Sequence, residues 1–104
     1  MSEGGGRIAI VTGAAGTMGE VTARRLIADG YRVALIDIAA QRLNAFVAEF
    51  GRKAIAVTSD ISDSLQAERA VDETEQKLGP VSVLVNNAGI LSNNKIAEIG
   101  RAHV

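Results

Sequence analysis

Four short apolar segments alternate along this chain with three longer amphipathic ones, and this alternation restricts the possible fold more than any other feature of the sequence. The short segments have apolar, mostly β-branched centres, a pattern typical of strands that are buried on both faces of a sheet. The predicted strands lie at 7–12, 31–37, 53–58 and 81–85.

The three longer segments carry apolar residues at helical spacing, with charged residues on the opposite side. A glycine follows each of them, as expected where a helix ends. The first two predicted helices cover 17–29 and 40–50. The third runs to Leu78, and Ser62 or Asp63 is its expected N-cap.

Strands and helices that alternate in this way predict an α/β fold in which parallel strands are joined by right-handed crossovers. We expect part of a Rossmann-type doubly wound parallel sheet, with four strands in the order 3-2-1-4 and helices on both faces. This single domain would cover 7–98, after a flexible leader at 1–6. The strand at 81–85 would be an apolar sheet edge, which predicts poor solubility.

Composition and charge exclude several classes of function. The chain has 11 Lys+Arg against 12 Asp+Glu, so it lacks the basic surface that nucleic-acid binding requires. No apolar run approaches the roughly 18 residues of a membrane span, and the N-terminus does not resemble a signal peptide. We therefore expect a cytoplasmic protein without a membrane partner. With no cysteine and one histidine, His103, no metal site is expected.

A glycine-rich segment, TGAAGTMG, joins the first predicted strand to the first predicted helix. A helix N-terminus there offers unpaired N–H groups and a positive dipole end, which together bind a pyrophosphate. Gly13 would form the tight turn, Gly16 would admit the phosphates to the backbone, and Gly19 would let the helix pack on the strand. The alternative is a turn that requires only a positive φ. The other residues of the predicted binding loop are Ala15, Thr17 and Met18.

Asp37 closes the second predicted strand, a little over 20 residues after Gly13, where a ribose-binding acid is expected. Its carboxylate can accept hydrogen bonds from both adenosine-ribose hydroxyls. It would repel a 2′-phosphate, because like charges about 4 Å apart cost roughly 4 kcal/mol at an effective dielectric near 20. No Lys or Arg lies in the loop or beside Asp37, so the sequence favours NAD over NADP. Ile38 is included in the predicted cofactor site, and a solvated Asp at a strand end is the alternative.

Two further motifs, SDI after the third strand and NNAG after the fourth, complete a pattern that resembles the short-chain dehydrogenase/reductase family over about 7–91. The resemblance implies that Asp60 binds the adenine amino group and that Ile61 contacts the adenine ring. It also implies that Asn87, Ala88 and Gly89 line the cofactor cleft and steady the central sheet.

These assignments have structural alternatives, and the glycine loop departs from the family pattern. Asp60 can be a turn or capping residue, and a buried Asn pair can serve backbone groups alone. The family's usual TGxxxGxG has a glycine where Thr17 stands. The spacing TGxxGxxG belongs to a longer, epimerase-like branch, against which NNAG argues. We therefore interpret Thr17 as a variant whose hydroxyl can face the phosphates.

The resemblance also implies a reaction, but the sequence lacks the residues for it. Family members transfer hydride between the nicotinamide and, here, a small alcohol or carbonyl compound, using a Tyr, a Lys four residues later and an upstream Ser. The single tyrosine, Tyr31, lies in a predicted strand with Leu35 four residues on. No residue of the chain is therefore assigned a catalytic role, and the fragment alone is predicted to be inactive. The full-length protein is expected to be a homo-oligomer.

The last six residues, IGRAHV at 99–104, have no place in the expected helix. They match one reading frame of a widely used sequencing-library adapter, so we expect a non-native tail. The leading hypothesis is the N-terminal cofactor-binding part of an NAD-dependent short-chain dehydrogenase/reductase. The alternatives are a non-enzymatic NAD-binding or sensing module and a structural domain that binds no nucleotide.

Overall fold

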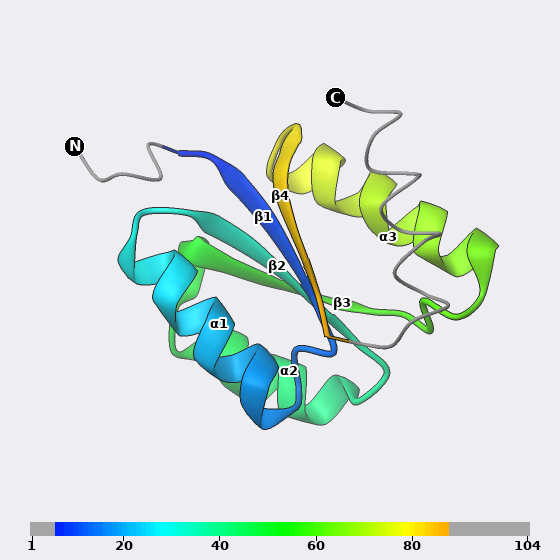
Figure 1. Cartoon of the computed structure of the whole chain (residues 1–104), viewed down its shortest axis with the longest axis horizontal. Helices are drawn as coiled ribbons and strands as arrows, with labels where there is room; N and C mark the ends of the chain where they lie inside the picture. Colours follow the sequence, from blue (N-terminus) through cyan, green and yellow to red (C-terminus); the bar gives the residue numbers. More distant parts are fainter. Residues whose placement is uncertain (1–5, 88–104) are drawn as a thin grey trace.

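In the computed structural model, which describes residues 6–87, the four strands lie in the order β3-β2-β1-β4 (Figure 1). Every neighbouring pair is parallel, so all four carboxyl ends reach the same edge of the sheet. Both findings confirm the predicted partial Rossmann-type sheet. The strands are β1 (Ile8–Thr12), β2 (Arg32–Asp37), β3 (Ala54–Thr58) and β4 (Val81–Asn86).

The helices cover both faces of the sheet, as predicted: α1 and α2 lie on one face and α3 on the other (Figure 1). The second helix ends two residues earlier than predicted, because the chain turns there toward Gly51, whose φ is +58°. A short 3₁₀ helix, which the sequence pattern did not predict, then leads into β3. The helices are α1 (Thr17–Ala28), α2 (Ala40–Ala48), η1 (Gly51–Lys53) and α3 (Ser64–Lys77).

The hydrophobic core consists of two layers, one on each side of the sheet. Every residue of β1 is buried, because β1 lies between β2 and β4 and is covered on both faces. The glycine loop therefore begins at the end of a buried inner strand. The layer under α1 and α2 includes Ala9, Val11, Val33, Leu35, Ala23 and Leu43. The layer under α3 includes Ile10, Ala34, Ile36, Ala67 and Val71.

Strand β4 contains a one-residue irregularity near its start. Ile8 of β1 pairs with Val81, but the next residue, Ala9, pairs with Val83, so Ser82 is an extra residue in the β4 strand. As a consequence Val81 packs in the α3 layer while Val83 packs in the opposite one. Strict alternation would have put both valines on the same face.

Arg24 of α1 fixes this helix to the end of α2. Its guanidinium donates to both carboxylate oxygens of Glu49 at 3.0 Å, and to Glu20 at the same distance. It also lies over the rings of Phe46 and Phe50, 5.0 and 5.3 Å from their centroids. The hydrogen bond to Glu49 raises the pKa of Arg24 and lowers that of the Glu49 carboxyl. This cluster links the two helices that flank the glycine loop.

Asp63 caps α3, which decides between the two residues predicted for this position. Its carboxylate accepts hydrogen bonds from the N–H groups of Leu65 and Gln66 at 2.9 and 3.3 Å. We expect Asp63→Ala to lower the free energy of unfolding by about 1 kcal/mol, because two N–H groups of the first turn lose their acceptor. Urea unfolding of this variant beside Glu68→Ala, an exposed mid-helix control, measures the effect. Equal losses in the two variants would contradict the capping role.

Candidate functional site

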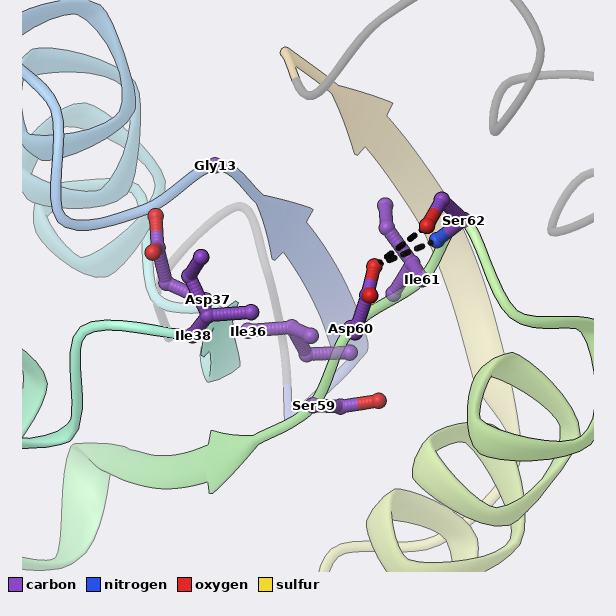
Figure 2. A pocket seen from close by; sticks show the side chains of 8 residues that line it. All are labelled: Gly13, Ile36, Asp37, Ile38, Ser59, Asp60, Ile61 and Ser62. Atoms are coloured by element: carbon purple, nitrogen blue, oxygen red, sulfur yellow. Dashed lines mark hydrogen bonds between the residues drawn. The ribbon is translucent and has the colours of Figure 1, made fainter.

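The carboxyl ends of β1, β2 and β3 open onto one cleft of about 270 Å³ (Figure 2). The cleft brings together three segments that the sequence analysis assigned to one site: the start of the glycine loop, the end of β2 and the turn after β3. Its lining residues are Gly13, Ile36, Asp37, Ile38, Ser59, Asp60, Ile61 and Ser62.

The three glycines of the loop have different steric surroundings. Gly13 has a φ of +61°, and a Cβ atom there would lie 3.2 Å from the backbone carbonyl group of Asn87. A Cβ atom on Gly19 would lie 2.4 Å from the Gly13 carbonyl oxygen and 2.6 Å from the Ala14 Cα atom. At Gly16 a Cβ atom would make only an ordinary contact of 3.5 Å. Gly19 is thus the position where helix α1 and the loop pack too closely for any side chain.

The first three N–H groups after Gly13 are engaged within the protein. Two of them donate to backbone carbonyl groups, and the middle one donates to a side chain. Ala14 N–H donates to Ile36 O at 3.2 Å, Ala15 N–H to Asp37 Oδ2 at 3.1 Å, and Gly16 N–H to Gly13 O at 3.2 Å.

The next three N–H groups, at the start of α1, have no acceptor among residues 6–87. They belong to Thr17, Met18 and Gly19, and the first helical bond runs from Glu20 N–H to the Gly16 carbonyl oxygen at 3.0 Å. Gly16 is the N-cap and supplies no side-chain acceptor. Because these donors lie at the positive end of the helix dipole, this end of α1 can hold an anion.

Asp37 lies at the mouth of the glycine loop, as predicted. Its Oδ2 atom accepts the N–H of Ala15 at 3.1 Å, and its Oδ1 atom accepts the N–H of Ala39 at 3.0 Å. In Figure 2 its carboxylate points toward the loop near Gly13. The neighbouring Ile38 side chain is 70% exposed beside the same cleft. A carboxylate and an apolar side chain thus lie next to the open end of α1.

The turn after β3 supplies the other wall of the cleft. One carboxylate oxygen of Asp60 accepts both the N–H of Ser62 at 3.0 Å and its hydroxyl at 2.6 Å (Figure 2). These two bonds lower the pKa of the Asp60 carboxyl. The turn role considered for Asp60 is therefore present in the structure. Ile61 is 6% exposed and packs in the α3 layer, so little of its side chain faces the cleft.

The end of β4 is joined to the end of β1 through the hydroxyl of Thr12. This hydroxyl donates to Asn86 Oδ1 at 2.6 Å and accepts the N–H of Asn87 at 3.1 Å. Thr12 is fully buried, and the sequence analysis assigned it no role. The signal that could have pointed to it is a polar residue that ends an otherwise apolar strand. Ala88 and Gly89, also predicted at this site, lie outside the described residues.

The sequence model of the short chain dehydrogenase family matches residues 7–104. The chain belongs to the short-chain dehydrogenase family. Meso-2,3-butanediol dehydrogenase of Serratia marcescens is 39% identical over 81% of this chain and 34% of its own length. Sorbitol dehydrogenase of Cereibacter sphaeroides is 35% identical over 92% of this chain and 38% of its own length. The chain thus spans little more than a third of these curated relatives.

Solved structures agree with the fold. A short chain dehydrogenase/reductase from Burkholderia phymatum in complex with NAD matches with a TM-score of 0.90, at 22% identity, over 100% of this chain and 46% of its own. At that identity the match shows the fold alone. A blue fluorescent protein from a metagenomic library, in complex with NADPH, matches with a TM-score of 0.87 at 30% identity, over 96% of this chain and 52% of its own.

The described part of this short-chain dehydrogenase chain has neither a metal-binding cluster nor a membrane-spanning helix. Within residues 6–87, no group of three or more His, Cys, Asp or Glu side chains is placed to hold a metal ion. None of the helices in that range is long and apolar enough to cross a membrane.

Proposed function

We propose that this chain is the N-terminal cofactor-binding part of an NAD-dependent short-chain dehydrogenase/reductase. The observation that carries this proposal is the position of Asp37. Its carboxylate lies at the mouth of a glycine loop, next to a helix end where three N–H groups have no acceptor among residues 6–87. A dinucleotide carries both an anionic diphosphate and a ribose diol. The two features together therefore fit one ligand better than either fits alone.

The diphosphate would bind at the start of α1. Thr17 and Met18 are exposed residues, and their N–H groups donate to no acceptor in the described part of the chain. The helix dipole adds roughly 0.3–1 kcal/mol for a negative charge at this end. Gly13 and Gly16 leave the approach free of side chains, and the Thr17 hydroxyl offers a further donor.

The ribose and adenine would lie along the cleft between the ends of β2 and β3. The Asp37 carboxylate would accept both ribose hydroxyls, and the exposed side chain of Ile38 would cover the adenine ring. Asp60, at the far wall, would face the adenine amino group, with Ile61 beneath. The NNAG segment, with Asn87, Ala88 and Gly89, would complete the cleft.

NAD is favoured over NADP because of charge. A 2′-phosphate on the ribose would lie against the Asp37 carboxylate, and like charges about 4 Å apart cost roughly 4 kcal/mol at an effective dielectric near 20. Neither the glycine loop nor the residues adjacent to Asp37 include a Lys or Arg that would offset this repulsion.

The bound nicotinamide would supply the hydride chemistry, and a small alcohol or carbonyl compound would be its partner. Support for this substrate class comes from the relatives named as butanediol and sorbitol dehydrogenases. The catalytic Ser, Tyr and Lys would lie in a further part of the protein, so these 104 residues alone would be inactive. We also propose that the full-length protein is a cytoplasmic homo-oligomer and that residues 99–104 are a non-native tail after a domain covering 7–98.

Thermal unfolding with and without NAD tests the cofactor assignment. At a free NAD concentration 100 times its Kd, binding adds roughly 2.7 kcal/mol to the stability. Since 1 kcal/mol shifts the Tm of a domain this size by roughly 4–8 °C, we expect a rise of about 10 °C or more. NADP at the same concentration should raise the Tm by several degrees less. No shift with either dinucleotide would contradict the assignment, and a larger shift with NADP would contradict the preference for NAD.

A further inference from the structure

The Asp37 carboxylate connects two segments that are separate in the sequence. One oxygen accepts the Ala15 N–H in the glycine loop, and the other accepts the Ala39 N–H at the N-cap of α2. Both oxygens are thus engaged by the protein's own backbone. A carboxylate oxygen has two lone pairs, so each oxygen keeps a further acceptor position for a hydroxyl group.

Ala15 lies in the middle of the loop, and the hydrogen bond that its N–H donates has a different kind of acceptor from those of its neighbours. Ala14 and Gly16 donate to backbone carbonyl groups, whose positions follow from the strand and the turn. The Ala15 peptide is the one among these three that depends on a side chain. Ala15 is also the last residue before the N-cap of α1, so the orientation of the peptide group that carries its N–H affects where the N–H groups of Thr17 and Met18 point.

We propose that Asp37 is a positioning residue for the glycine loop, in addition to its expected role as the ribose acceptor. By holding the Ala15 peptide, its carboxylate fixes the entry into α1 so that the Thr17 and Met18 N–H groups face the anion before any ligand binds. The identification of that anion as a diphosphate rests on the proposed function. The orientation of the Ala15 peptide does not.

The first test measures amide hydrogen exchange and needs no ligand. In the unmodified protein, the Ala15 N–H is expected to exchange more slowly than those of Thr17 and Met18. In Asp37→Asn the Ala15 N–H should exchange about tenfold faster, because the amide side chain has one acceptor where the carboxylate has two. The Ala14 N–H, bonded to Ile36, serves as the internal reference for global opening. An unprotected Ala15 in the unmodified protein, or equal rates in both proteins, would overturn the proposal.

The matched control is Asp60→Asn. This change removes the same charge from the same cleft, but its carboxylate is bonded to Ser62 and not to the loop. The exchange rate of Ala15 should not respond to it. If Asp60→Asn accelerates the exchange of the Ala15 N–H as much as Asp37→Asn does, the effect is electrostatic. The proposal that Asp37 positions the loop would then be wrong.

The second test titrates each protein with inorganic pyrophosphate, which has no ribose. If Asp37 acts on the ribose alone, removing its charge leaves pyrophosphate affinity unchanged or raises it, as expected for Asp60→Asn. If Asp37 positions the loop, Asp37→Asn should weaken pyrophosphate binding severalfold despite the lost repulsion. Unchanged or tighter binding by Asp37→Asn would overturn the proposal while the proposed function stands. An unmodified protein that binds neither pyrophosphate nor NAD would instead refute the proposed function, and the exchange test would still decide the role of Asp37.

Discussion

Gly19→Ala is expected to lower the free energy of unfolding by about 2–3 kcal/mol and to abolish the stabilisation by NAD. The added Cβ atom would lie 2.4 Å from the Gly13 carbonyl oxygen and 2.6 Å from the Ala14 Cα atom. Both neighbours are backbone atoms, so relief requires α1 to move away from the end of β1. Overpacking of this kind typically costs 1–3 kcal/mol, and the better helix propensity of alanine returns at most about 1 kcal/mol.

Gly16→Ala is the matched control for this prediction. A Cβ atom there would meet only the Gly13 carbonyl oxygen, at the ordinary distance of 3.5 Å, and the φ of Gly16 is −82°. Urea unfolding should therefore show a loss of well under 1 kcal/mol. If the two variants lose the same free energy of unfolding, the close backbone contacts at Gly19 are not the cause of the loss.

Thr12→Val is expected to lower the free energy of unfolding by about 2 kcal/mol. Valine matches threonine in shape and suits a buried strand, so the change removes little besides the hydroxyl. The Asn86 side chain then loses a donor and the Asn87 N–H loses its acceptor. Groups that lose a partner in a buried setting cost roughly 1–3 kcal/mol each, and the exposure of Asn87 reduces its share.

Thr12→Ser keeps the hydroxyl and loses only a methyl group. It should retain most of the stability that Thr12→Val loses, and its melting curve measured beside that of the valine variant decides the point. A serine variant as unstable as the valine variant would show that packing of the methyl group, and not the hydroxyl, holds β4 to β1. Because Asn87 also lies against Gly13, the valine variant should bind NAD more weakly as well.

The sequence pattern predicted the strand order, the two-sided helix cover and the approach of Asp37 to the glycine loop. Each of these follows from local periodicity together with the rule that parallel strands end at one edge. The meeting of Asp37 with the loop required that β1 and β2 be neighbours, which is usual for consecutive strands joined by a short crossover and is found here.

Features that depend on particular long-range contacts could not be predicted. The extra residue Ser82 in β4 has no signature in the sequence, because a serine between two valines also fits regular alternation, and the irregularity appears only once the pairing with β1 is known. The bridging hydroxyl of Thr12 depends on a partner 74 residues away. Likewise, Ile61 is buried under α3 because of the conformation of the turn after β3. The spacing of apolar residues along the sequence does not predict that conformation.

The pairing of β1 with β4 sets an order of events during synthesis. A ribosome makes β1 first, but its second neighbour comes from the far end of the described chain. Until that neighbour emerges, a largely apolar central strand has one edge open to pairing with any other extended chain, which favours aggregation. Closing a loop over such a span has a high entropic cost and is therefore slow. We expect the pairing of β1 with β4, next to the glycine loop, to form late in folding.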